Sequence, residues 1–163
     1  MSAKPTETLP KMGERTSSST LYALGAVKTP SKYDLNALKA LKTTTVTVQG
    51  QNQNGQASTT TYGGVLLTDL LTNAGGVQFK TGSKNDFLRK GMVAVGTDGY
   101  SCMVVGGEID AHFAHTSVLV ATSMNNNALP ASDGFARLIV PGDQAMGRFV
   151  FTLTELQVVD FDS

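Results

Sequence analysis

The apolar residues of this 163-residue chain come in many short runs that glycine, asparagine and proline separate. The runs at residues 43–49, 92–96 and 117–122 are rich in β-branched residues and have the length of strands. Charged helical heptads and internal repeats are missing. This pattern predicts many short strands with at most three helices, in one α+β domain whose strands are mixed or mostly antiparallel.

Helical spacing of leucine predicts a short amphipathic helix over residues 33–41, with Asp34 as its N-cap. A second helix is expected over residues 65–74, after Gly63 and Gly64 have broken a strand at 57–62. Residues 107–115 are compatible with a third helix. The Asp-Gly pair at 98–99, between two apolar runs, predicts a hairpin turn. Final strands are expected over residues 148–153 and 155–159.

Composition excludes several classes of protein. Thirteen Lys and Arg balance thirteen Asp and Glu, so no overall positive field favours nucleic acid. The apolar runs are far shorter than the ~20 residues that a membrane-spanning helix needs. A single cysteine, Cys102, excludes an internal disulfide framework. The sequence thus predicts a domain that binds no nucleic acid and does not span a membrane.

Residues 1–19 are polar, rich in Ser, Thr and Lys, and contain two prolines. We expect a disordered lead-in or linker there and a folded domain over residues 20–163. The lead-in has no apolar core of a signal peptide, but such a stretch also remains after signal or lipoprotein processing. A periplasmic or secreted location is therefore expected, with the cytoplasm left open.

Few residues point to chemistry by their own pattern. Cys102 lies in an apolar strand near acidic residues, which favours a buried structural thiol over a reactive thiolate. On a helix, His112 and His115 would share a face and could bind zinc or nickel together with Asp110. Arg137 and Arg148, the only basic residues after Lys90, could bind an anion or pair with nearby acidic residues.

Several segments, taken in order, resemble the oxidoreductase molybdopterin-binding domain, which has the sulfite-oxidase fold. Residues 62–71 read Tyr-Gly-Gly-Val-Leu-Leu-Thr-Asp-Leu-Leu and are similar to the family's G-V-x-L-x-D-L-L helix start. The Asp-Gly-Tyr at 98–100 and the Gly-Phe-Ala-Arg-Leu-Ile-Val-Pro-Gly at 134–142 follow in the family's order. The resemblance covers about residues 20–160. It implies a barrel-like α+β core with a pocket for molybdenum bound to pterin dithiolene.

The same resemblance implies which residues would form that pocket. Catalytic members bind molybdenum through the cysteine of a C-x-G-N stretch, and Gln49 stands at that position here. Asp133 stands where these members often have His, and Phe151 where they have Lys or Arg. The remaining cofactor-binding candidates are carried over by motif, together with the residue at the cysteine position: Gln49, Asn52, Asp98, Tyr100, Arg137 and Arg148.

Two functions are compatible with this pattern, and a metal carrier that uses Asp110, His112 and His115 is a third hypothesis. The first is a molybdenum-pterin oxidoreductase, or a subunit of one, in which Arg137 and Arg148 hold the anionic pterin or substrate and a redox protein is the partner. The second is a non-catalytic binding module of the same fold, which has lost the thiolate and holds a small anion, a pterin or a protein. Molybdopterin and the absence of any cofactor are thus both compatible with the chain.

Overall fold

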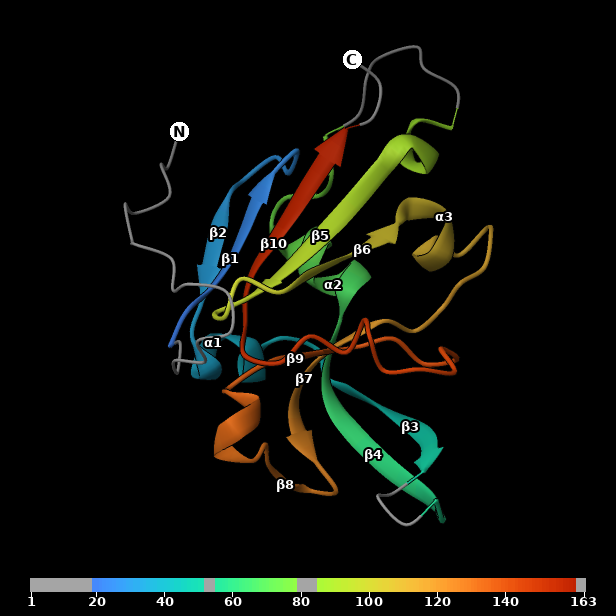
Figure 1. Ribbon diagram of the computed structural model, residues 1–163. Coiled ribbons are helices and arrows are strands. Elements are labelled where there is room, and N and C mark those ends of the chain that lie inside the picture. The colour runs from blue at the N-terminus through green and yellow to red at the C-terminus, as the bar shows by residue number, and fades with distance from the viewer. Residues whose placement is uncertain (1–18, 52–54, 79–84, 161–163) are drawn as a thin grey trace.

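The computed structural model describes residues 19–51, 55–78 and 85–160. Its strands form two open five-stranded sheets, which Figure 1 shows one above the other, with helices α1 and α2 near the level where they meet. The predicted α+β domain with mixed, mostly antiparallel strands is confirmed. The barrel-like core is not, because the described strands stay in two separate open sheets. The predicted lead-in falls almost wholly outside the described residues.

The first sheet joins the two ends of the folded domain. Its order is β2 (Ser31–Tyr33), β1 (Leu21–Gly25), β10 (Leu153–Asp160), β5 (Lys90–Gly96) and β6 (Ser101–Val105). β1 and β10 run parallel, and the other neighbours are antiparallel. The predicted Asp-Gly turn connects β5 to β6. β6 is the last strand in this order and therefore forms an edge of the sheet.

The second sheet has the order β3 (Thr44–Gln51), β4 (Ala57–Leu66), β7 (Leu119–Met124) and β8 (Asn127–Ala128). A further strand, β9 (Arg137–Ile139), pairs with β7 beside β8. All these pairs are antiparallel. β9 thus places Arg137 in the second sheet, whereas the Asp-Gly turn belongs to the first.

The helices are short. They are α1 (Leu35–Ala40), α2 (Leu67–Asn73) and α3 (Gly106–Ile109), with the 3-10 helices η1 (Asp86–Arg89) and η2 (Ala131–Asp133). The predicted cap of the first helix is confirmed, because the carboxylate of Asp34 accepts a hydrogen bond from the backbone N–H of Ala37 at 2.8 Å.

Three local predictions are wrong. The strand β4 does not break at Gly63 and Gly64. It passes through them with a shift in register and ends at Leu66, so α2 begins two residues later than expected. The expected helix over 107–115 ends at Ile109, where the chain turns. Residues 148–152 do not join the expected pair of final strands, since β10 begins only at Leu153.

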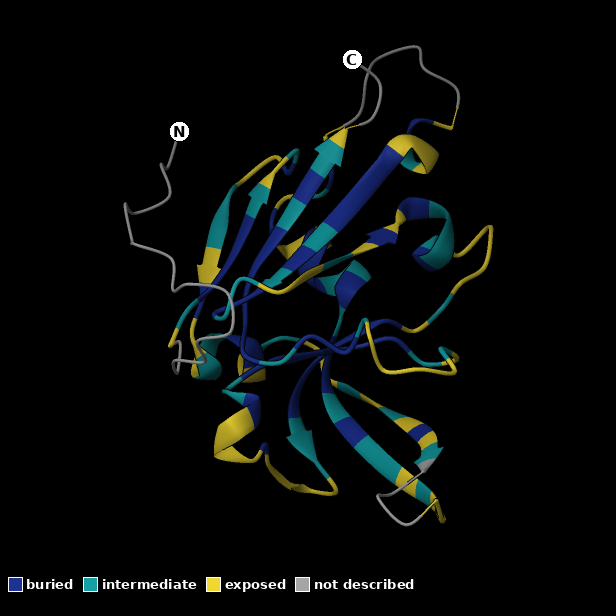
Figure 2. Cartoon of the chain, viewed as in Figure 1, coloured by how far each residue is buried: buried dark blue, intermediate teal, exposed yellow. Residues whose placement is uncertain are grey.

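Leucine side chains from both sheets and from α1 and α2 fill the interior, which Figure 2 shows as dark blue segments at the centre of the molecule. Burial of such side chains stabilises the fold by roughly 1.5–3 kcal/mol each. The fully or nearly fully buried ones include Leu38, Leu67, Leu70, Leu119, Leu138 and Leu153. No helix in the described part of the chain is long and apolar enough to cross a membrane.

At Gly64, β4 passes too close to β7 for a side chain. A Cβ atom there would lie 2.1 Å from the carbonyl oxygen of Val120 and 2.7 Å from Cα of Ala121. Because both are backbone atoms, we expect Gly64→Ala to lower the free energy of unfolding by about 1–3 kcal/mol in urea denaturation. Gly50→Ala is the matched control, since its Cβ would meet nothing nearer than 3.7 Å. Equal losses in the two variants would contradict the tight approach.

Candidate functional site

Asp98 and Tyr100 lie at the turn between β5 and β6. The carboxylate of Asp98 accepts a hydrogen bond from the backbone N–H of Tyr100 at 3.1 Å. The hydroxyl of Tyr100 donates a short hydrogen bond to the carbonyl oxygen of Gly147. These contacts hold the β5–β6 turn against the loop that precedes β10. Asp98 and Tyr100, two of the cofactor-binding candidates, therefore lie beside this loop.

Arg137 is a buried residue whose guanidinium is held entirely by the protein. Nη1 donates to the carboxylate of Asp133 at 3.4 Å and to the hydroxyl of Tyr62 at 3.3 Å, and Nε donates to the carbonyl of Phe149 at 3.3 Å. Its Cζ lies 3.7 Å from the centre of the Phe151 ring. Asp133 is also buried, so the charge of Arg137 is neutralised inside the fold.

Arg148 lies beside the edge strand β6. Nε and Nη2 each donate to an oxygen of Asp143 at 2.8 Å, while Nη1 donates to Glu108 at 2.8 Å and to the carbonyl of Met103 at 3.2 Å. Glu108 also accepts the backbone N–H of Val105. The guanidinium of Arg148 therefore has two carboxylate partners. Together, Arg148 and Glu108 cover backbone atoms of the edge strand β6 that would otherwise be open to pairing with another strand. Both arginines thus pair with acidic residues, which is one of the two roles that the sequence allowed for them.

The ion pair between Arg148 and Asp143 makes the free energy of unfolding depend on pH in the acidic range. The hydrogen bonds from Arg148 hold the pKa of the Asp143 carboxyl below its ordinary value, and burial opposes this only in part. A lowered pKa in the folded state adds stability above about pH 3.9, and that stability is lost as pH falls through the folded value. We expect Asp143→Asn to lose less stability than the unmodified chain between pH 5 and pH 3, measured by urea denaturation. An identical loss in both proteins would contradict the pairing.

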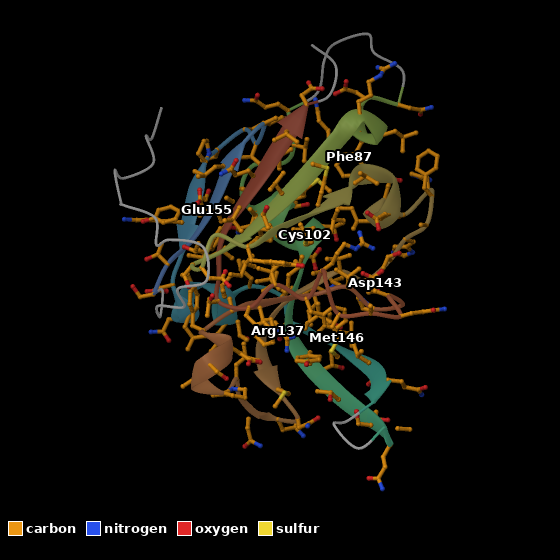
Figure 3. The ribbon with its side chains drawn as sticks, in the orientation of Figure 1. Phe87, Cys102, Arg137, Asp143, Met146 and Glu155 are labelled. Atoms are coloured by element: carbon orange, nitrogen blue, oxygen red, sulfur yellow. The ribbon has the colours of Figure 1, made fainter. Side chains whose placement is uncertain are left out.

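A small cavity borders two of the candidates, Asp98 and Tyr100. It has a volume of about 160 Å³ and lies beside the β5–β6 turn. Arg137 lies behind it against Phe149 and Phe151, and Figure 3 shows Arg137 and Met146 in the middle of the molecule. Arg148 follows the lining residue Gly147 in the chain. The lining residues are Asp98, Tyr100, Met146, Gly147, Phe149 and Phe151.

The position that matches the family's cysteine lies on β3. Gln49 is exposed and pairs in register with Thr59 of β4. A Cβ on the next residue, Gly50, would lie 3.7 Å from Cε of Met146, so this end of β3 approaches the small cavity. An amide cannot replace a thiolate as a soft metal ligand. The candidate Asn52 lies outside the described residues.

Cys102 does not replace the missing ligand. It is half-buried on β6, and its thiol lies 3.7 Å from the carbonyl oxygen of Arg148, to which it can donate. Burial raises the pKa of the Cys102 thiol, and the nearby Arg148 offsets only part of this rise. The thiol therefore stays protonated more readily than a free cysteine, which is unfavourable for a metal ligand.

Asp110, His112 and His115, which could bind a metal if they lay together on a helix, do not share a helical face. α3 ends at Ile109, and the carboxylate of Asp110 accepts the backbone N–H of His112 within the following turn. Among the residues that the structure describes, no three His, Cys, Asp or Glu side chains gather as a metal site would require.

A larger cavity of about 510 Å³ lies elsewhere, between α2, η1 and the turn after α3. Its lining includes Leu71, Phe87, Ile109 and His115, and none of the six candidates carried over from the family. Its size is that of an ordinary ligand pocket. In contrast, Asp98 and Tyr100 line the small cavity, Arg137 contacts its lining residue Phe151, and Arg148 follows its lining residue Gly147.

Several residues that line the small cavity or pair with Arg148 were not predicted from the sequence. Phe149 and Met146 had no motif to mark them, and Phe151 was noted only for the basic residue it replaces. Glu108 and Asp143 lie 40 and 5 residues from Arg148 in the chain. After Lys90 the chain has eight acidic residues and only two arginines, and this excess was the one available signal, but it did not identify the partners.

Comparison with known proteins agrees with this architecture. Residues 9–163 match the model of the family described as the oxidoreductase molybdopterin binding domain. Among solved structures, the chain is similar to the sulfane dehydrogenase SoxCD from Paracoccus pantotrophus, with 23% identity and a TM-score of 0.70. The match covers 86% of this chain but only 38% of that one. At this identity the likeness concerns the fold. A comparison with curated proteins gives no match.

Proposed function

This chain belongs to the oxidoreductase molybdopterin binding domain family, and we propose that it is a non-catalytic member: a ligand-binding module that does not carry molybdenum-pterin. The observation that carries the proposal is the buried ion pair between Arg137 and Asp133. The arginine that the family resemblance assigns to an anionic cofactor is already neutralised by a carboxylate of the same chain.

The available donor groups support the same conclusion. The thiolate position carries the exposed amide of Gln49, and the thiol of Cys102 has a raised pKa. A pterin phosphate is a dianion that needs cations or free backbone N–H groups. Arg148, the second basic candidate, faces the two carboxylates of Asp143 and Glu108. These residues do not fit the cofactor.

The size of the cavity is a third, independent argument. Pockets that bury drug-sized ligands have volumes of about 300–1,000 Å³. The cavity beside Asp98 and Tyr100 has about 160 Å³. A tricyclic pterin with its phosphate is at least as large as such ligands, so the cavity suits a much smaller molecule.

The proposal is tested by the pterin content of the whole chain, purified from a host that makes the cofactor. Oxidation of the protein extract converts bound pterin into a fluorescent product. We expect no pterin fluorescence above that of a blank preparation, whereas a catalytic sulfite-oxidase-type domain from the same host serves as the positive control. Pterin in an amount near that of the protein would overturn the proposal.

A further inference from the structure

The strand β3 forms a long edge of the second sheet. It has eight residues and pairs with β4 on one side, and no strand in the described part of the chain lies on its other side. Figure 1 shows β3 at the outer end of this sheet. Backbone N–H and C=O groups along such an edge are a template for pairing with another strand. β3 is therefore a candidate interaction surface.

The other short or terminal strands have features by which proteins keep strand edges from pairing. β2, β8 and β9 have only three, two and three residues, and β2 carries the exposed Lys32. On β6, Arg148 and Glu108 bond backbone groups of Met103 and Val105. Short strands, lysine and charged side chains on the edge all oppose pairing. β3 is long, keeps an unbroken register with β4 and contains neither proline nor charge, so it is the described edge best suited to pairing.

The segment that contains β3 and β4 carries no charge. Charged residues make up 16% of the chain, but residues 43–68 contain none. The exposed side chains of β3 are those of Thr45, Thr47 and Gln49. Like charges directly opposite each other destabilise a pair of strands. Two copies of this uncharged strand can therefore approach each other without that repulsion.

Hydrogen bonds around Thr61 show which backbone groups of β3 face the open edge. The N–H of Thr61 donates to Oδ1 of Asn125 at 3.0 Å, and its carbonyl oxygen accepts the N–H of Asn125 at 2.7 Å. Because both groups of Thr61 point away from β3, its register partner Thr47 forms a non-hydrogen-bonded pair with it. The two hydroxyls lie 3.2 Å apart. The N–H and C=O groups of Thr47 therefore point to the open edge, as do those of Thr45 and Gln49, two residues away on either side.

An antiparallel pair of two β3 strands centred on Thr47 uses all of these groups. Thr47 then lies opposite Thr47 of the second copy, and Thr45 lies opposite Gln49. On the other face of the strand, Val46 lies opposite Val48. Each outward-facing residue thus enters a hydrogen-bonded pair, in which two residues exchange both N–H···O bonds. Threonine pairs and pairs of apolar β-branched residues are favourable across strands, so β3 is complementary to itself.

We propose that the chain forms a symmetric dimer through antiparallel pairing of its β3 strands. A twofold axis passes beside Thr47, and the second sheets of the two copies become one continuous sheet. Because each copy uses its single β3 in the contact, the assembly closes at two chains. This dimer is independent of the proposed function, because β3 contributes no residue to the lining of the small cavity.

Sedimentation equilibrium of the whole chain, from about 50 µM to about 1 mM, tests for the dimer. We expect the mean mass to rise with concentration from the 17.1 kDa of one chain towards that of two. Hydrogen exchange of the ¹⁵N-labelled chain, followed by NMR, locates the contact. The amides of Thr45, Thr47 and Gln49 should exchange about twofold or more slower at the highest concentration than at the lowest. Those of Val46 and Val48 face β4 and should exchange equally at both.

A charge at the centre of the contact should break it. Thr47→Lys brings two lysines opposite each other at the twofold axis and should weaken dimerisation at least about tenfold. The matched control is Thr59→Lys, which adds the same charge to an exposed position of the neighbouring strand β4. It should change the dissociation constant by less than about threefold, because β4 lies one strand away from the contact. The NMR spectrum of each variant reports whether it is folded.

Two double variants test the register. Thr45→Lys with Gln49→Glu brings opposite charges together twice across the twofold axis. Thr45→Lys with Gln49→Lys brings like charges together at the same two places. The first should dimerise about 5- to 50-fold more tightly than the second. In a parallel pairing each residue would meet its own copy, so both variants would be weakened alike.

A dimer with slowed exchange at the three outward-facing amides, lost in Thr47→Lys and kept in Thr59→Lys, supports the pairing. A single chain at every concentration overturns it and leaves the β3 edge to a strand of another protein. A dimer that Thr47→Lys does not weaken, or whose slowed amides lie outside β3, also overturns it. Equal affinities of the two double variants overturn the antiparallel register centred on Thr47.

Discussion

Arg137→Met should lower the free energy of unfolding by about 3–5 kcal/mol, because it leaves the buried carboxylate of Asp133 without its cation. The substituted side chain keeps the apolar part that packs near Phe151 and loses every donor. The hydrogen bonds to Tyr62 and to the carbonyl of Phe149 are lost with it. Urea denaturation at neutral pH, with linear extrapolation to water, measures the loss.

Two controls separate the ion pair from the side chain's volume. The double variant Arg137→Met with Asp133→Asn removes both charges and should recover a large part of the lost stability. Arg148→Met breaks a pair that is 29% exposed on the arginine side and should cost only about 1 kcal/mol. If Arg137→Met is as stable as the unmodified chain, Asp133 does not need this cation and the argument against an anion-binding Arg137 fails.

Lys90→Met is the second substitution with a large expected effect. The lysine side chain is 2% exposed, and Nζ lies 3.0 Å from Asp86 and 2.6 Å from Asp160. Removing the ammonium breaks the ion pair with Asp86, whose buried side chain is 3% exposed. We expect a loss of about 3–5 kcal/mol in the free energy of unfolding. Adding Asp86→Asn should restore much of it, and the exposed Lys32→Met should change stability by less than about 0.5 kcal/mol.

The titration of Lys90 should also lower the stability of the fold at alkaline pH. Burial alone would lower the pKa of Lys90, but the hydrogen bonds and charges of Asp160 and Asp86 outweigh it and raise the pKa. A raised pKa in the folded state adds stability below about pH 10.4, and that stability is lost as pH rises through the folded value. The unmodified chain should lose this contribution in strong alkali, and Lys90→Met should not. Parallel stability curves for the two proteins above pH 10 would contradict this reading.

Much of the fold could be predicted from local pattern. The Asp-Gly turn between β5 and β6 and the Asp34 cap of α1 depend on neighbouring residues, and both are present. The continuation of β4 through Gly63 and Gly64 could not be predicted, because it depends on the close approach of β7 from about 60 residues away. The end of α3 at Ile109 was also missed: the chain turns there, and the Asp110 carboxylate accepts the backbone N–H of His112, a local hydrogen bond that the residue spacing did not indicate.

The site could be predicted only in part. The family resemblance selected Asp98 and Tyr100, which line the small cavity, and Arg137, which lies behind it. It could not reveal that Asp133 neutralises Arg137, because a sequence motif carries no information on which charges meet in the fold. The lining residues Phe149 and Phe151 were missed for the same reason. Phe149 is a buried core residue, and only the placement of the β5–β6 turn shows that it and Phe151 also border this cavity.

The most direct test of the account is the molybdenum content of the whole chain, purified from a host that makes the cofactor and measured by elemental mass spectrometry. We expect no molybdenum above a blank preparation, because Gln49 offers no thiolate and the nearby arginines are paired with carboxylates of the chain. A content close to one molybdenum atom per chain would contradict it and identify this protein as a molybdenum carrier without the cysteine ligand.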